Sequence, residues 1–214
     1  MLTGTGIEAG YLRNHPVLRA VDIEIAPGEV VGLAGPSGCG KSTLARVLAL
    51  LLAPWSGRVS IDGVPAVGVG YQAPRQQRTA IGVVFQQPRL SVDPRLTLRE
   101  AIVEPLRAGK RRLDDNQIAE LTDRVGLSIE LLDRRPHEVS DGQLQRACIA
   151  RALILRPRYL ICDEMTAMLD TSTTAALVDV VMTQATQTGA GVLAISHDEA
   201  LLAVWAHRVQ HFSA

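Results

Sequence analysis

The sequence predicts an α/β fold, and three observations support this prediction. Short apolar runs typical of strands alternate with stretches of helical character along most of the 214 residues. Glycine and proline mark the boundaries between these stretches. A helical block from about residue 98 to 155 interrupts the alternation and indicates an inserted subdomain. The length and the hydrophobic content of 47% suit a single domain with a sizeable core.

The first half of the chain is expected to be rich in strands. Apolar and polar residues alternate in LRAVDIEI at residues 18–25, as in a half-exposed strand, and a Pro-Gly turn follows. The run EVVGLA at residues 29–34 is mostly apolar, as in a buried strand. We expect strands at residues 18–25 and 29–34, a helix at 41–52, and strands at 57–62 and 79–85.

The second half begins with the helical block, which is broken near Gly109, Gly126 and Pro136. We expect a strand at residues 159–162, a helix at 172–187, and strands at 192–195 and 208–212. The sequence therefore predicts a single domain over residues 1–214. Its core is formed by residues 1–87 and 157–214, and residues 88–156 or so form a helical insertion.

The composition excludes several kinds of protein. The 22 Lys and Arg residues balance the 22 Asp and Glu residues, whereas proteins bound to nucleic acid by bulk electrostatics carry a basic face. Three cysteines without C-x-x-C spacing argue against a disulfide framework or a zinc site. We expect no signal peptide, and no membrane span, because the longest apolar run (residues 47–53) is far shorter than the roughly 20 residues needed.

Residues 35–42 (GPSGCGKS) fit the pattern G-x-x-x-x-G-K-[ST] between an expected strand and an expected helix. Glycines let consecutive backbone N–H groups point at phosphate oxygens, and the helix N-terminus favours the same anion. Lys41, one of only two lysines in the chain, would reach the β- and γ-phosphates, and Ser42 would offer a hydroxyl to Mg²⁺. The candidate ATP-binding residues here are Gly35, Pro36, Ser37, Gly38, Cys39, Gly40, Lys41, Ser42 and Thr43.

Two carboxylates end the apolar strand YLIC at residues 159–162. In a P-loop ATPase, an Asp in this position holds Mg²⁺ beside the Ser of the phosphate loop, which makes Asp163 a candidate metal-binding residue. Glu164 would project to the other side of the strand and polarise an attacking water as a general base. An Asp-Glu turn on the surface is the structural alternative, and the phosphate loop favours the functional interpretation.

Residues 139–146 (VSDGQLQR) resemble the L-S-G-G-Q signature of ABC transporter ATPases. The resemblance extends along nearly the whole chain. It implies a P-loop NTPase (RecA-like) core with an antiparallel β subdomain and an inserted α-helical subdomain. It also implies that the signature residues face ATP bound to an opposite subunit. These residues are Ser140, Asp141, Gly142 and Gln143.

The same resemblance assigns roles to further residues. Tyr11 would stack on adenine, and Gln86 would be the Q-loop glutamine that touches Mg²⁺, with Gln87 as the alternative. Asp170 would end the D-loop, and His197 would be the switch histidine that contacts the γ-phosphate. The implied catalytic residues are therefore Glu164, His197 and Lys41, and the implied Mg²⁺ ligands are Ser42, Gln86 and Asp163.

The resemblance implies an ATP hydrolase that energises an ABC transporter from the cytoplasmic face of the cell membrane, as a peripheral protein with ATP and Mg²⁺ as cofactors. Its partners would be a second ATP-binding subunit, two transmembrane permease subunits and, indirectly, an extracytoplasmic substrate-binding protein, with no nucleic acid. Short stretches such as FQQP at residues 85–88 are similar to importers of peptides and nickel. The alternatives are a soluble ABC-type ATPase acting on nucleic acid or ribosomes, and a low-activity regulatory subunit.

Several residues depart from the family pattern. Asp141 replaces a glycine, Met165 replaces a proline, and residues 167–168 replace the usual Ser-Ala of the D-loop. At about 5 Å and an effective dielectric near 20, the carboxylate of Asp141 would repel a phosphate by on the order of 3 kcal/mol. We therefore expect a non-identical partner subunit, with the site built from this signature as the weaker of two. A C-terminal extension usual in peptide-type importers is not expected in these residues.

Overall fold

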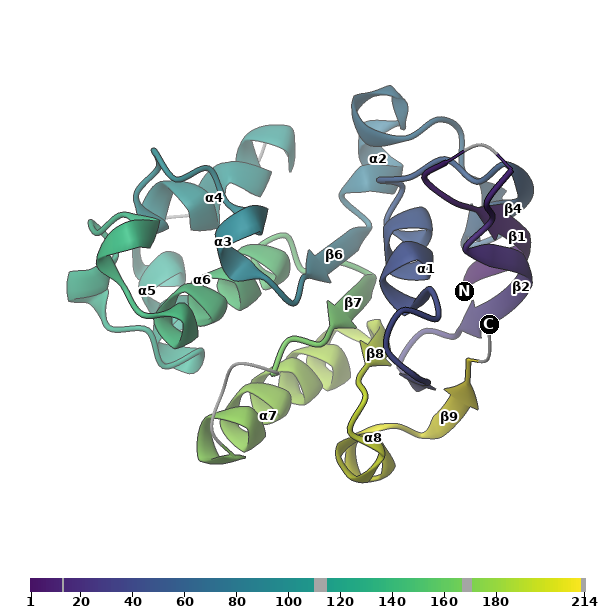
Figure 1. Ribbon diagram of the computed structural model, residues 1–214. Helices are drawn as coiled ribbons and strands as arrows, with labels where there is room; N and C mark the ends of the chain where they lie inside the picture. Colours follow the sequence, from purple (N-terminus) through teal and green to yellow (C-terminus); the bar gives the residue numbers. More distant parts are fainter. Residues whose placement is uncertain (13, 110–114, 167–170, 213–214) are drawn as a thin grey trace.

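The computed structural model describes residues 1–12, 14–109, 115–166 and 171–212, and it contains two β-sheets surrounded by helices (Figure 1). The strands of the first sheet are β1 (Leu2–Ala9), β2 (Leu18–Ile25), β4 (Ser56–Ile61) and β5 (Val64–Pro65). They are antiparallel in the order β2-β1-β4-β5. This sheet forms the β subdomain that the resemblance implied.

The strands of the second sheet are β3 (Val30–Ala34), β6 (Ile81–Val84), β7 (Tyr159–Asp163), β8 (Gly191–Ile195) and β9 (Arg208–His211). They are parallel in the order β6-β7-β8-β3-β9. The carboxyl ends of parallel strands lie at one edge of a sheet, which is where open α/β sheets bind ligands. The residues that follow β3, β6, β7 and β8 are therefore brought together at this edge.

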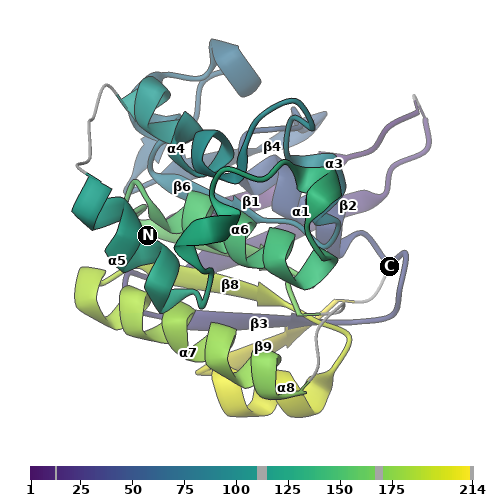
Figure 2. The same ribbon diagram turned by 90° about the vertical axis from the view of Figure 1, so that its left-hand side faces the viewer.

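Helix α1 (Lys41–Leu48) packs on one face of the parallel sheet, and α7 (Thr171–Thr188) and α8 (Glu199–Trp205) pack on the other face (Figure 2). Side chains alternate between the two faces of a strand. Along β7, Tyr159 and Ile161 pack with α1 and the antiparallel sheet, whereas Leu160 and Cys162 pack with α7 and α8. Helix α1 is thus held between the two sheets, and this fixes the phosphate loop at its N-terminus.

The helices between β6 and β7 gather at one side of the molecule, on the left in Figure 1. They are α3 (Pro88–Ser91), α4 (Leu98–Gly109), α5 (Asp115–Arg124) and α6 (Asp141–Leu153), with 3-10 turns at Ile129–Leu131 and Pro136–Glu138. Helix α6 is central, because α3, α4 and α5 all contact it. A 3-10 turn (Gly70–Gln72) and helix α2 (Arg75–Arg78) lie between β5 and β6.

The predicted fold class is confirmed, but the sequence did not indicate every element. Strand β1 was missed because register shifts, after Gly4 and Ile7 in its pairing with β2 and after Thr5 in its pairing with β4, interrupt its two-residue alternation. Helix α8 was also missed. Helix α1 is shorter than expected and ends at Leu48, because Leu50 adopts a left-handed backbone conformation with φ of 58°. The division into core and helical insertion near residues 88 and 156 stays a prediction.

None of the helices in the described ranges is both long enough and apolar enough to span a lipid bilayer.

Candidate active site

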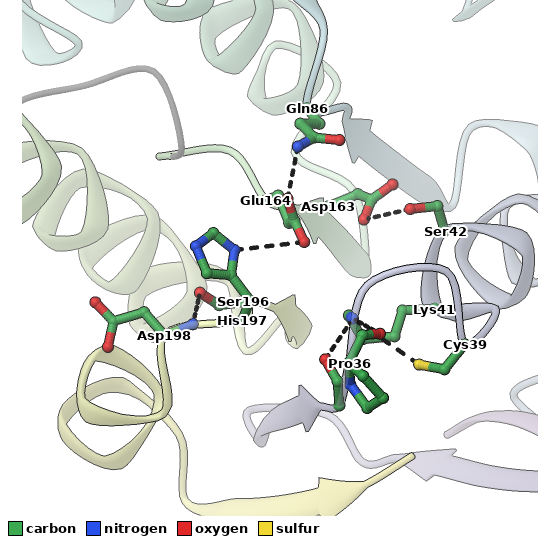
Figure 3. Close-up of polar contacts among 11 residues, drawn as sticks. Pro36, Cys39, Lys41, Ser42, Gln86, Asp163, Glu164, Ser196, His197 and Asp198 are labelled. Atoms are coloured by element: carbon green, nitrogen blue, oxygen red, sulfur yellow. Dashed lines mark hydrogen bonds and ion pairs between the residues drawn. The ribbon is translucent and has the colours of Figure 1, made fainter. Parts of the chain in front are cut away.

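The phosphate loop lies between β3 and α1, as predicted. The glycines have structural reasons to be there: Gly38 and Gly40 have φ of 81° and 109°, and a Cβ on Gly35 would lie 2.4 Å from the carbonyl oxygen of Phe212. The ammonium group of Lys41 folds back over the loop and donates to the carbonyl oxygens of Gly35 and Pro36, at 2.7 and 2.9 Å (Figure 3). The loop therefore holds its one cation at the N-terminus of α1.

Ser42 and Asp163 meet at the junction of α1 and β7, as the metal-site prediction requires. The hydroxyl of Ser42 donates to Oδ1 of Asp163 at 3.1 Å (Figure 3). Asp163 is 3% exposed, and this burial, together with the charge of Glu164, raises the pKa of its carboxyl group, although the Ser42 hydrogen bond and the charges of Arg46 and Lys41 act in the opposite direction. A divalent cation would stabilise the charged form of this buried group.

Glu164 lies between two of the predicted partners. Its Oε2 accepts a hydrogen bond from Nε2 of Gln86 at 2.6 Å, and its Oε1 lies 3.6 Å from Nδ1 of His197. Figure 3 shows both side chains pointing at the carboxylate, Gln86 from above and His197 from the left. These three residues follow β7, β6 and β8, so the parallel sheet brings them together. The carboxylate is mostly buried, with 14% of its side chain exposed.

The backbone at Glu164 explains why its side chain leaves the strand direction. Its φ is 47°, which is rare for a residue with a Cβ, and its N–H donates to the carbonyl oxygen of Ile195 at 3.0 Å. Such strain persists where the surroundings hold it and is common at functional sites. The turn aims Glu164 away from Asp163 and toward Gln86 and His197.

A cavity of about 480 Å³ opens beside this edge of the sheet. Gln86 and its sequence alternative Gln87 both line it, but among the contacts of the described residues it is Gln86 that bonds Glu164. The cavity also reaches the two predicted metal-binding residues at the N-terminus of α1 and the end of β7. Its lining residues are Ser42, Arg46, Phe85, Gln86, Gln87, Leu90, Ser91 and Asp163.

Gln145 is a site residue that the sequence reasoning missed. It is 2% exposed on α6, and its Nε2 donates to the carbonyl oxygens of Met165 at 2.9 Å and Phe85 at 3.4 Å. These two residues directly flank Glu164 and Gln86 in the chain. Its position two residues after Gln143 was the only available signal, because both contacts cross between distant segments.

The signature residues lie at the start of α6. Ser140 caps the helix, with its hydroxyl accepting from the N–H of Gln143 at 3.2 Å, while Oε1 of Gln143 accepts from the N–H of Ser140 at 3.0 Å. Asp141 forms an ion pair with Nε of Arg89 at 2.6 Å. Within the described residues, these polar contacts do not reach the phosphate loop.

Two predicted residues remain apart from this cluster. Tyr11 is 56% exposed and accepts a hydrogen bond from Arg46 of α1, whose guanidinium also lies over the ring at 5.9 Å. Its ring is therefore held near the phosphate loop, although its role in adenine stacking stays a prediction. Asp170, with residues 167–168, lies outside the described residues.

The fold and the phosphate loop define a P-loop nucleotide-binding protein. A family model described as ABC transporter matches residues 18–167, and the chain therefore belongs to the ABC transporter family. The predicted family resemblance is confirmed.

Named relatives are consistent with this family. A probable peptide ABC transporter ATP-binding protein of Sinorhizobium fredii is 41% identical over 95% of this chain and 60% of its own length. The nickel import ATP-binding protein NikE of Escherichia coli is 38% identical over 94% of this chain and 76% of its own length. The chain thus spans only about 60% of the first of these relatives.

Solved structures share the fold. The dimeric structure of MJ0796, a bacterial ABC transporter cassette, superposes with a TM-score of 0.88 at 27% identity, over 99% of this chain and 94% of that one. A second structure, described as a post-hydrolysis state of the same cassette with ADP and Pi bound, gives a TM-score of 0.87 over 100% of this chain and 94% of that one.

Proposed function

We propose that this chain is the ATP-binding and ATP-hydrolysing subunit that energises an ABC importer. The observation that carries the proposal is the position of Glu164, which lies between Gln86 and His197 beside the junction of Ser42 and Asp163. A mostly buried carboxylate next to a phosphate-binding loop is suited to activating water against a bound γ-phosphate.

The phosphate loop would bind the triphosphate. Backbone N–H groups of residues 35–42 and the N-terminus of α1 favour an anion there. Lys41 now donates to neutral carbonyl oxygens, and phosphate oxygens would be stronger acceptors for its ammonium group. Lys41 would then stabilise the charge that develops on the γ-phosphoryl group during transfer.

Glu164 would take the proton from the attacking water. Gln86 donates to Oε2 of Glu164 and so fixes the orientation of the carboxylate, with Oε1 facing His197. His197 has 61% of its side chain exposed, so its ring can contact both Glu164 and a phosphate that approaches from solvent. Positioning of the water by these groups, rather than covalent chemistry, would supply the rate enhancement.

The donor set at the edge of the sheet suits Mg²⁺. Ser42, Asp163 and Gln86 offer hydroxyl, carboxylate and amide oxygens, which are the hard ligands that Mg²⁺ prefers. Because Mg²⁺ is usually bound by one or two carboxylates together with substrate phosphates and water, phosphate oxygens would complete the coordination. The ion would neutralise charge on the β- and γ-phosphates.

The partners follow from the position of the signature. Because residues 140–143 make their contacts away from the phosphate loop of the same chain, they would serve a nucleotide on a second ATP-binding subunit. We propose that this subunit is non-identical, because Asp141 and Met165 depart from the family pattern in segments that would reach across the subunit interface. Two permease subunits would dock near the cavity beside Gln86 and hold this chain at the cytoplasmic membrane face. The names of the relatives support peptides or nickel as cargo, delivered by an extracytoplasmic binding protein.

The transport assignment is tested by gentle affinity purification of the chain from its native membranes, followed by mass spectrometry. We expect two multi-span permeases and a second ATPase to co-purify with it. Recovery from the soluble fraction with ribosomal or DNA-bound proteins would contradict the assignment as an importer subunit, although it would not contradict ATP hydrolysis.

A further inference from the structure

Arg89 joins two segments that lie more than 45 residues apart in the chain. Its Nε lies 2.6 Å from Oδ1 of Asp141, while Nη1 and Nη2 donate to the carbonyl oxygens of Pro136 and Val139 at 2.8 and 3.1 Å. One guanidinium thus binds both the first residue of α6 and the turn that leads into it. The planar fork of arginine suits this three-way contact, which a lysine could not reproduce.

The partner of Arg89 is the residue that adds a negative charge to the signature. Asp141 stands between Ser140 and Gly142, at the helix end that would face a nucleotide phosphate. An unpaired carboxylate there would oppose the phosphate, whereas the guanidinium of Arg89 offsets its charge at contact distance. The repulsion expected from the sequence alone is therefore reduced by an ion pair within the chain.

Further contacts tie the segment that carries Arg89 to the same helix. The hydroxyl of Ser91 lies 3.4 Å from Sγ of Cys148, and Arg151 donates to the carbonyl oxygen of Ser91. Helix α3 begins two residues after Gln86, so these contacts connect the segment after β6 with both ends of α6.

We propose that Arg89 is a positioning residue of the composite ATP site, one that makes Asp141 compatible with a phosphate bound opposite the signature. This inference rests on the proposed function, because it assigns Arg89 to the signature side of that site. The pair is half-exposed, at 46% for the Arg89 side chain and 44% for the Asp141 side chain, and such pairs contribute little to folding stability. Loss of this ion pair should therefore change the rate of ATP turnover more than the free energy of unfolding.

A double-mutant cycle tests the proposal in the complex of this chain with the subunits that co-purify with it. The variants are Arg89→Gln, Asp141→Gly and the double variant, each compared by KM and kcat for ATP. Arg89→Gln should lower kcat/KM by about tenfold, because it removes the positive charge that offsets the Asp141 carboxylate near the phosphate. Asp141→Gly should restore most of this loss in the double variant.

Arg95→Gln is the matched control. Arg95 lies in the same segment and forms an exposed ion pair with Asp93 at 2.7 Å, and within the described residues its polar contacts are all with Asp93 and not with α6. Its turnover should match wild type. If Arg89→Gln lowered kcat/KM equally in the wild-type and the Asp141→Gly backgrounds, the proposal would be overturned. An unchanged kcat/KM in Arg89→Gln would also overturn it.

Two further measurements separate this proposal from the proposed function. ATP binding to the phosphate loop of the isolated chain should be unchanged by Arg89→Gln, and its absence in wild type would contradict the proposed function instead. Hydrogen exchange without nucleotide should be faster at residues 136–143 in Arg89→Gln, because two carbonyl contacts are lost. Unchanged exchange would show that Arg89 does not position this segment.

Discussion

Lys41 occupies a space that suits a narrow ammonium group. It is 5% exposed, and its Nζ lies between the loop carbonyls and Sγ of Cys39, at 3.9 Å from the sulfur. A guanidinium is wider and planar, so it would need the loop to open before it could take the same place. This explains a lysine here in a chain that otherwise uses arginine for nearly all of its cationic side chains.

We therefore predict that Lys41→Arg lowers ATP affinity at least about tenfold even though the charge is kept. Isothermal titration with a slowly hydrolysed ATP analogue measures this directly. The control is Arg58→Lys on β4, an exposed exchange of the reverse kind that should leave affinity unchanged. Wild-type affinity in Lys41→Arg would show that the ammonium group is not specifically required.

At this scale the sequence indicated the residues but not their contacts. Local patterns were enough to predict the phosphate loop, Asp163, Glu164, Gln86 and His197 as candidate site residues. Arg89 and Gln145 were not found, because their importance depends on carbonyl oxygens and a carboxylate supplied by segments 20 or more residues away. The sequence alone places Asp141 as an unpaired charge, and only the fold supplies its partner.

At the scale of the elements, Gln145 connects α6 to the segments that carry Gln86 and Glu164, the residues proposed to act in hydrolysis. Its amide donates to the carbonyl oxygens of Phe85 and Met165, which directly flank Gln86 and Glu164. Helix α6 thereby holds the backbone next to both residues of the Gln86–Glu164 hydrogen bond. Movement of α6 relative to β6 and β7 would alter the orientation of Glu164.

We predict that Gln145→Leu lowers kcat by about tenfold with little change in ATP affinity, since misplacing a reacting group by about 1 Å can cost more than this. Steady-state kinetics and nucleotide titration separate the two effects. Gln184→Leu on α7 is a matched control, because Gln184 is also buried and hydrogen-bonded, to Arg124, but lies away from the site. An equal fall of kcat in both variants would indicate a general loss of stability.

The elements also show where sequence patterns fail. Strand β3 is buried on both faces and was expected from its apolar run. Strand β1 contains two glycines, and its pairing with both neighbours is interrupted by register shifts, so its pattern does not alternate. Its place at the centre of the antiparallel sheet depends on pairing with β2 and β4. Such pairing is set by segments that are distant in the sequence.

Across the whole molecule, Asp62 links the antiparallel sheet to the start of β7. It accepts from the hydroxyl of Tyr159, forms an ion pair with Arg158, and binds the amino group of Met1 at 2.7 Å. Partial burial acts to raise the pKa of Asp62, but these hydrogen bonds and positive charges outweigh it and lower the pKa below its ordinary value of 3.8. The charged form therefore stabilises the junction of the two sheets.

A group with a lowered pKa in the folded state stabilises the protein above its ordinary pKa and loses this effect as the pH falls through the folded value. We predict that Asp62→Asn lowers the free energy of unfolding by about 1–2 kcal/mol at neutral pH. The difference should shrink below about pH 3.8. Denaturant unfolding at several pH values measures it, with the highly exposed Asp115→Asn as the control. A difference that does not change with pH would contradict this account.

The most direct test of the central claim is a comparison of ATP hydrolysis by wild type and Glu164→Gln. The amide keeps the size of the side chain and can still accept from Gln86, but it cannot take a proton from water. We predict unchanged ATP affinity with hydrolysis slowed by roughly 10²–10⁴-fold, the usual contribution of a general base. The exposed Glu199→Gln is the control. Turnover within twofold of wild type would contradict the role of Glu164 and the mechanism built on it.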